Sequence, residues 1–194
     1  KYIKFKYNFF NITENEILKL NNVTIKKPYD YYGANSQYNG NIYLNEVFYF
    51  DDIVKIKVKK IAHSLSTNYI SIHLRLGDKF LETDKKYVNV KRDERSFNEE
   101  NIYNLIRKSK KNFLFLCDNN EYKSKIKKKF RDIFITNCQI GHTSLENTTN
   151  IQFIDTITEF YILTKSDIIY AASRSGFSQM AAKFNDVKYV ELYK

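Results

Sequence analysis

His73, Arg75, Gly77, Asp78 and Lys79 stand within seven positions, directly after a short apolar run. The guanidinium of Arg75 is planar and permanently charged, which suits it to bind two phosphate oxygens at once. Gly77 lets the main chain turn where a side chain would obstruct. A surface ion pair between Arg75 and Asp78 is the alternative, and such pairs contribute little to stability. Because so much charge follows a buried run, we favour a ligand site for phosphate oxygens.

Two further polar clusters also follow apolar runs. One is Asp118-Asn119-Asn120, and the other is the segment 173–179, which reads SRSGFSQ. Ser175 and Gly176 precede a predicted helix, whose first N–H groups are unpaired and positively polarised, and serine hydroxyls there add donors for a phosphate. Ordinary N-capping by Ser175 or Ser178 is the alternative. If Arg75 faces this helix end, the two clusters together form a candidate diphosphate site.

For these clusters to form one site, the strands that precede them must end at the same edge of a sheet. Apolar, β-branched runs predict strands at 69–74, 112–117, 132–136, 167–171 and 187–192. Helical periodicity predicts helices at 46–65, 96–110, 121–130, 153–165 and 177–184. Alternating strands and helices imply right-handed crossovers and a mostly parallel sheet. We therefore predict an α/β, Rossmann-like domain over residues 46–194, whose ligands bind outside the carboxyl ends of the strands.

The chain has 194 residues and a formal net charge of +10, which raises nucleic acid and anionic membranes as partners. Much of the excess lies in 55–60 and 123–131, on predicted amphipathic helices, and we interpret it as solvent-exposed helix faces. No zinc-finger, helix-turn-helix or RNP pattern is present, so we expect no nucleic-acid partner. The two cysteines and three histidines lack metal-ligand spacing. No apolar run approaches the roughly 20 residues that span a bilayer, so we expect no transmembrane segment.

With these clusters in place, the sequence resembles the donor-binding half of GDP-fucose-dependent fucosyltransferases of the GT-B type, which include α-1,2, α-1,6 and protein O-fucosyltransferases. Three segments carry the resemblance in order: 73–79 (HLRLGDK, the family's His-x-Arg-x-x-Asp signature), 113–119 (FLFLCDN) and 159–179. The resemblance implies that this chain is the C-terminal, donor-binding domain of a GT-B glycosyltransferase. Such an enzyme would transfer fucose from GDP-fucose to a glycan acceptor with inversion, without a metal or other cofactor.

The resemblance also implies which residues bind the donor phosphates. Arg75 matches the residue that binds the β-phosphate, and Gly77 belongs to the same signature. Ser175, Ser178 and Gln179 match the turn that hydrogen-bonds the phosphates. The segment 173–179 departs from the usual serine-rich turn in having an inserted arginine and glycine. A related nucleotide sugar is therefore an open alternative to GDP-fucose.

Other residues match the nucleoside side of the family's pocket. His73 matches a residue near the guanine and ribose, although a histidine that buttresses the loop is an equal alternative. Asp118 matches an aspartate that lines the nucleoside pocket. Glu159 matches the carboxylate that recognises guanine, with Asp155, one turn earlier, as a rival.

Asp78 and Glu82 are the candidates for the base that accepts the proton of the attacking acceptor hydroxyl. In the α-1,6 branch a lysine after the signature aspartate and a nearby glutamate serve acceptor activation. The spacing of Glu82 differs from that pattern by one residue, and we interpret Lys79 as structural or phosphate-facing.

The sequence leaves other functions open. Polysaccharide pyruvyltransferases share a His-x-Arg-x-Gly-Asp-like segment, but 173–179 lacks the histidine that this group usually has near its end. A non-catalytic module that binds nucleotides or glycans within a larger glycosylation protein is a further alternative. A GT-B enzyme needs a second domain for the acceptor. Residues 1–45 are too few to supply it, so we expect this segment to be a remnant of, or link to, further domains of a longer, cytoplasmic parent protein.

Overall fold

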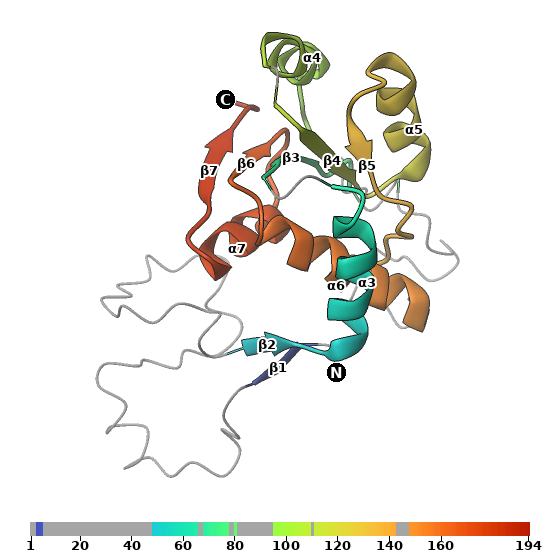
Figure 1. The fold of residues 1–194 in the computed structure, drawn as a ribbon. Coiled ribbons are helices and arrows are strands. Elements are labelled where there is room, and N and C mark those ends of the chain that lie inside the picture. The colour runs from blue at the N-terminus through green and yellow to red at the C-terminus, as the bar shows by residue number, and fades with distance from the viewer. Residues whose placement is uncertain are drawn as a thin grey trace, which may run out of the picture.

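Parallel strands in the order β5-β4-β3-β6-β7 form the central five-stranded sheet (Figure 1). The computed structural model describes residues 3–5, 48–65, 68–77, 80, 95–109, 111–142 and 148–194. The strands are β3 (Ile70–Leu74), β4 (Phe113–Cys117), β5 (Phe134–Ile135), β6 (Ile168–Ala171) and β7 (Lys188–Glu191). The chain runs from β3 outward to β5 and then crosses to β6, on the other side of β3. The order therefore reverses between β3 and β6, which is where open α/β sheets bind ligands.

Helices cover both faces of this sheet. On one face lie α4 (Glu99–Lys108) and α5 (Asn120–Lys129), and on the other α3 (Asp52–Ala62), α6 (Asn150–Leu163) and α7 (Gly176–Phe184). Side chains of a strand alternate between faces. Ile70, Ile72 and Leu74 pack into the α4/α5 core, whereas the side chains of Ser71 and His73 belong to the other face. The predicted α/β fold with a mostly parallel sheet is thus confirmed.

The register brings the carboxyl ends of β3 and β6 to the same level. His73 pairs with Leu116 of β4 on one side and Ala171 of β6 on the other. The ladder continues past the strand, because the N–H of Ala172 donates to the carbonyl of His73 at 2.9 Å. The polar segments that follow the two strands are therefore neighbours in space.

The predicted helix over 46–65 is wrong at its beginning. Phe48–Phe50 forms the strand β2, which pairs antiparallel with β1 (Ile3–Phe5). Helix α3 begins only at Asp52, after the N-cap Asp51, whose carboxylate accepts the N–H of Ile53 at 3.2 Å. Aromatic residues favour strands, and an aspartate before a helix is a strong start signal, so local preference outweighed the helical spacing of the apolar residues.

Helix α6 begins three residues before its predicted start. Thr149 and Gln152 form a reciprocal capping box, in which each side chain accepts a main-chain N–H of the other residue. This Thr-x-x-Gln pattern is a start signal that the apolar periodicity does not contain. The early start adds three residues at the amino end of the helix, which ends at Leu163.

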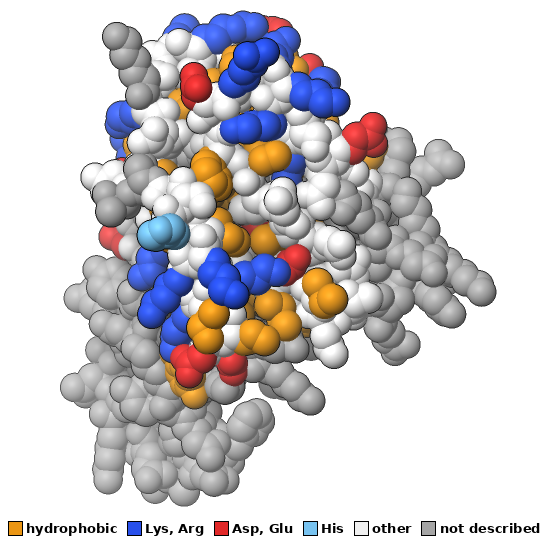
Figure 2. All heavy atoms as spheres, turned by 45° about the vertical axis from the view of Figure 1, so that its right-hand side comes forward, with side chains coloured by type: hydrophobic (Ala, Val, Ile, Leu, Met, Phe, Trp, Pro, Cys, Tyr) orange, Lys and Arg blue, Asp and Glu red, His pale blue; other side chains and the backbone are white. Residues whose placement is uncertain are grey.

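Among the described residues, no helix has the length and apolar character needed to cross a bilayer. Figure 2 shows one face of the molecule, with Lys and Arg side chains in several separate groups and uncharged side chains between them. Scattered cations of this kind are typical of solvent-exposed helix faces.

Candidate functional site

Ser173 joins the two polar segments that follow β3 and β6. Its hydroxyl accepts a hydrogen bond from the N–H of Arg75 at 2.9 Å and donates one to the carbonyl of Arg75 at 2.8 Å. The serine is fully buried, so neither bond competes with water. The structure thereby places Arg75 directly beside the turn that leads into α7, as the sequence pattern suggested.

The guanidinium of Arg75 lies near a buried carboxylate. Its Nη1 is 4.0 Å from Oδ2 of Asp118, and the Arg75 side chain is 20% exposed. An arginine that retains access at a strand end can present its charge to an anion from outside. Asp78, the alternative partner, lies outside the described residues.

Asp118 binds the main chain of the loop that follows β3. Its Oδ1 accepts the N–H of Leu76 at 2.8 Å, and its Oδ2 accepts the N–H of Gly77 at 3.1 Å. Burial raises the pKa of Asp118, against the opposite effect of these donors and of Arg75. Both carboxylate oxygens are thus engaged in the loop, and contact of Asp118 with a nucleoside stays a prediction.

The N-terminus of α7 lies at the same edge. Ser175 is its N-cap residue, yet the side chain makes no capping hydrogen bond, and its Oγ is buried without a hydrogen-bond partner. Ser178 is also buried and donates to the carbonyl of Ser175 at 3.3 Å, while Gln179 is half-buried. The simple N-capping alternative for Ser175 is therefore not what the structure shows. Its hydroxyl and the first N–H groups of α7 can serve an anion instead.

His73 contributes a second buried polar atom without a partner. The residue is 6% exposed, its Nδ1 has no hydrogen bond, and its ring stacks on Phe177 of α7 with centroids 5.4 Å apart. Burial, helped by the charges of Arg75 and Lys123, lowers the pKa of His73 to about 3. The imidazole is consequently neutral at physiological pH. Unsatisfied buried polar atoms are rare. His73 and Ser175 lie at and after the carboxyl ends of the neighbouring strands β3 and β6, which favours a ligand at this edge that supplies the missing partners.

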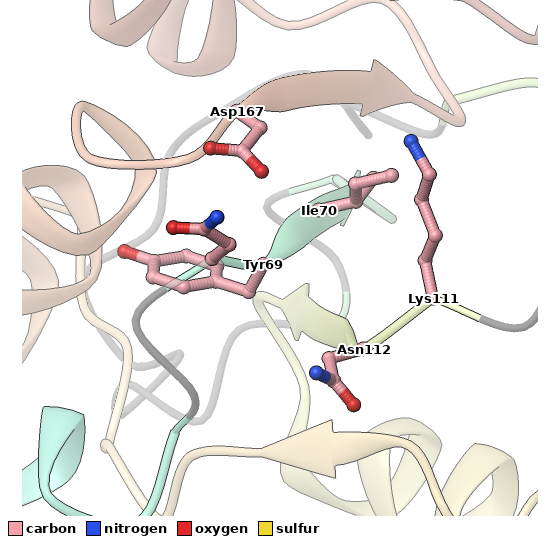
Figure 3. A pocket seen from close by; sticks show the side chains of 6 residues that line it. Tyr69, Ile70, Lys111, Asn112 and Asp167 are labelled. Carbon is pink, nitrogen blue, oxygen red and sulfur yellow. The ribbon is translucent and has the colours of Figure 1, made fainter.

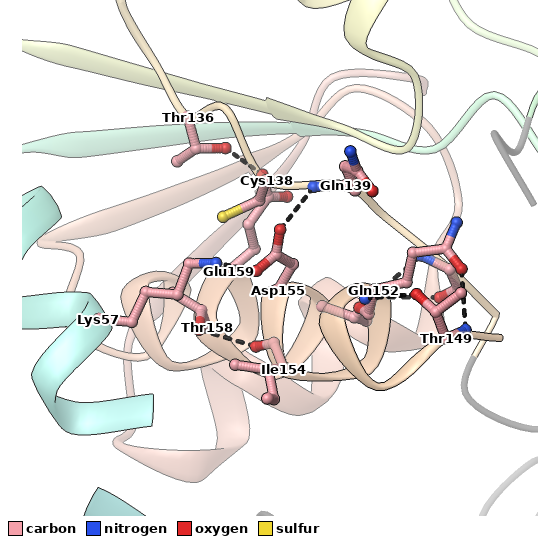
Figure 4. A network of polar contacts seen from close by, with 12 residues as sticks. Lys57, Thr136, Cys138, Gln139, Thr149, Gln152, Ile154, Asp155, Thr158 and Glu159 are labelled. Carbon is pink, nitrogen blue, oxygen red and sulfur yellow. Dashed lines mark hydrogen bonds and ion pairs between the residues drawn. The ribbon is translucent and has the colours of Figure 1, made fainter. Parts of the chain in front are cut away.

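Glu159 of α6 lies in a buried polar network with Thr136, which follows β5, and with Lys123 of α5. Figure 4 shows Glu159 and Thr136 within it. Its Oε1 accepts a hydrogen bond from Lys123 Nζ at 2.6 Å and another from the hydroxyl of Thr136. Burial alone would lower the pKa of Lys123, but the charge of Glu159 raises it above its ordinary value. A guanine base would have to approach this carboxylate through Oε2, so guanine recognition by Glu159 stays a prediction.

Asp155, the rival for guanine recognition, links three segments. Its Oδ1 pairs with Lys57 of α3, and its Oδ2 accepts the N–H of Gln139 at 2.8 Å (Figure 4). Both oxygens are therefore occupied by protein groups, which gives Asp155 a structural use in holding α3 against α6.

The buried position of Lys123 corrects the interpretation of 123–131 as a solvent-exposed face. Lys123 is 0% exposed, like Ile126 three residues later. Residues three apart share one helix face. The position of Ile126 on the buried face was the signal that could have found this lysine.

Three candidate residues fall outside the described part of the chain, and one hollow lies away from the edge that carries Arg75. Asp78, Lys79 and Glu82 are outside the described residues, and their roles stay predictions. A hollow of about 280 Å³ lies at the amino ends of β3, β4 and β6. It is lined by Asn68, Tyr69, Ile70, Lys111, Asn112 and Asp167 (Figure 3). It lies at the opposite edge of the sheet from Arg75. In the described ranges no group of three His, Cys, Asp or Glu side chains could hold a metal ion.

No family model and no curated protein sequence matches the chain. Among solved structures, it is similar to NodZ α-1,6-fucosyltransferase soaked with GDP-fucose, with 14% identity and a TM-score of 0.46 over 71% of this chain and 43% of that one. It is also similar to POFUT1 in complex with GDP, with 10% identity and a TM-score of 0.48 over 76% of this chain and 48% of that one. The chain thus spans less than half the length of either protein. Similarity at this level does not bear on function.

Proposed function

We propose that this chain is the donor-binding domain of an inverting, metal-independent glycosyltransferase that transfers fucose from GDP-fucose to a glycan acceptor. The observation that carries the proposal is the pair of hydrogen bonds between Ser173 and the main chain of Arg75. They set the main chain of Arg75, the arginine of the His-x-Arg-x-x-Asp signature, beside the turn that precedes α7, where the strand order reverses. Open α/β sheets bind ligands at this location.

In this proposal the site binds a diphosphate. The guanidinium of Arg75 binds the β-phosphate, and the first N–H groups of α7 with the hydroxyl of Ser175 bind phosphate oxygens from the other side. Negative charge grows on the diphosphate as the sugar departs. Fixed donors that meet this charge supply a large part of catalysis, and the loss of one typically costs about 3 kcal/mol of transition-state stabilisation.

The remaining roles are arranged around this diphosphate. His73, neutral and stacked on Phe177, offers Nδ1 to the nucleoside or to a phosphate oxygen. Glu159 recognises guanine through Oε2. Asp78 or Glu82 accepts the proton of the acceptor hydroxyl, whose binding surface belongs to further domains of a longer protein.

Calorimetric titration of GDP into the purified chain tests the proposal. We expect GDP to bind, and Arg75→Ala to weaken binding roughly 10- to 100-fold, the effect of losing hydrogen bonds to a charged group. Arg75→Lys should fall between the two, because lysine keeps the charge without the planar fork. Arg107→Ala, at an exposed arginine of α4, is the matched control and should bind like the wild type. No binding of GDP, or equal binding by Arg75→Ala, contradicts the proposal.

A second assay separates an enzyme from a non-catalytic binding module. We expect the chain, or the parent protein that contains it, to release fucose slowly from GDP-fucose when water replaces the acceptor. Tight GDP binding with no release of fucose above the uncatalysed rate would support the binding module instead.

A further inference from the structure

Every main-chain polar group of residues 75–77 has a hydrogen-bond partner. Ser173 serves the N–H and the carbonyl of Arg75, and Asp118 serves the N–H groups of Leu76 and Gly77. The remaining carbonyls, of Leu76 and Gly77, accept the N–H groups of Arg95 and Phe80, both at 2.9 Å. A loop with this complete set of bonds has little freedom to change its main-chain conformation.

Two buried side chains make most of these bonds, and they approach from opposite sides. Ser173 follows β6 and is 0% exposed, whereas Asp118 follows β4 and is 4% exposed. Since β3 lies between β4 and β6, the loop after β3 is held from both neighbouring strands.

We propose that Ser173 and Asp118 are positioning residues that fix the main chain of 75–77 and so hold the Arg75 guanidinium ready at the phosphate site. The inference rests on the proposed function of Arg75. Fixing a ligand-binding group before the ligand arrives avoids the cost of ordering it on binding. Neither Ser173 nor Asp118 needs to touch the ligand for this effect.

The chemistry of both residues fits the task. A hydroxyl on a short side chain can accept the N–H and donate to the carbonyl of the same residue, so threonine can replace Ser173 and alanine cannot. A carboxylate offers two acceptors to two neighbouring N–H groups. An asparagine at 118 would direct its NH₂ group at one of those donors and leave that N–H without a partner.

The test measures GDP and GMP binding by the full chain and its variants. We expect Ser173→Ala to weaken GDP binding about tenfold, as the loss of buried hydrogen bonds predicts, with little change for GMP, which lacks the β-phosphate. Ser173→Thr should restore the affinity for GDP. The double variant Ser173→Ala/Arg75→Ala should bind GDP no more weakly than Arg75→Ala alone, because the serine acts through the arginine. Ser71→Ala is the matched control, because Ser71 of β3 is as fully buried as Ser173. This variant should lose stability but keep its affinity for GDP.

Hydrogen exchange without ligand provides a readout that does not depend on GDP. We expect the amide of Arg75 to exchange at least tenfold faster in Ser173→Ala, and the amides of Leu76 and Gly77 to do so in Asp118→Asn, while Ser71→Ala leaves all three protected. Unchanged protection of these amides overturns the proposal, as does equal loss of GDP and GMP binding in Ser173→Ala. If the wild type binds no GDP, the proposed function fails and the role in ligand binding fails with it, while the exchange rates still decide whether the two side chains hold the loop.

Discussion

Lys123 and Glu159 form a buried ion pair across the carboxyl edge of the sheet. Lys123 Nζ lies 2.6 Å from Oε1 of Glu159, and neither side chain is more than 4% exposed. The lysine belongs to α5 on one face of the sheet and the glutamate to α6 on the other. The pair therefore joins the two helix layers that cover the sheet.

Removing one partner of this pair should cost far more stability than removing both. We expect Lys123→Met to lower the free energy of unfolding by about 3–5 kcal/mol, because it leaves a buried carboxylate without a counter-charge. The double variant Lys123→Met/Glu159→Leu should regain much of the loss. Urea unfolding at pH 7 measures both effects. Lys128→Met, at an exposed lysine of α5, is the control, and a Lys123→Met variant as stable as this control would contradict the structure.

Gly77 should tolerate no side chain. Its φ of 114° lies in a region that L-residues rarely adopt. Gly77→Ala is expected to cost about 1–3 kcal/mol of stability and to weaken GDP binding, because strain at this residue moves the loop that carries Arg75. Thermal unfolding and GDP titration measure the two effects. Gly176→Ala, at an exposed glycine in the first turn of α7, is the stability control and should leave the melting temperature unchanged or higher.

His73 should make the chain less stable in mild acid. Its pKa falls from 6.5 to about 3 on burial, so between these values the unfolded chain binds a proton that the folded chain does not. The contribution of His73 to the free energy of unfolding is therefore fully present above pH 6.5 and is lost as the pH falls toward 3. At pH 5 the loss from this residue is about 2 kcal/mol. Urea unfolding at pH 7 and pH 5 measures the difference, which His73→Gln should reduce. An equal pH dependence in both proteins would show that His73 is not held neutral by the fold.

Binding of GDP should not require a divalent metal. In the proposed site Arg75 and the N-terminus of α7 supply the positive charge that a metal supplies elsewhere. We expect the same affinity for GDP in excess EDTA and in millimolar Mg²⁺, measured by calorimetry at constant ionic strength. A large gain in affinity with Mg²⁺ that Na⁺ at matched ionic strength does not reproduce would contradict the metal-independent proposal.

The sheet could be predicted because its signals are local. The apolar runs at 69–74 and 112–117 and the predicted helix at 96–110 lie close to the observed β3, β4 and α4. Their order along the chain then determines a parallel sheet through the handedness of crossovers. The meeting of Arg75 with the turn before α7 follows from that topology.

What could not be predicted depends on pairs far apart in the sequence. Lys123 and Glu159 are 36 residues apart, and Leu76 and Asp118 are 42 apart. A lysine in a basic helix and an aspartate after a strand both resemble solvent-facing residues until the partner across the fold is known. The sequence therefore indicated the polar edge but not which of its members hold the protein together.

The hydrogen bonds between Arg75 and Ser173 join residues 98 positions apart in the chain. Such a contact forms only after the entropy of closing the loop between the two residues has been lost. Partly folded chains, in which β3 and β4 have paired but β6 has not yet joined, should therefore lack the anion site altogether. A ligand that binds here would then select fully assembled molecules and protect them from proteases, in proportion to its concentration.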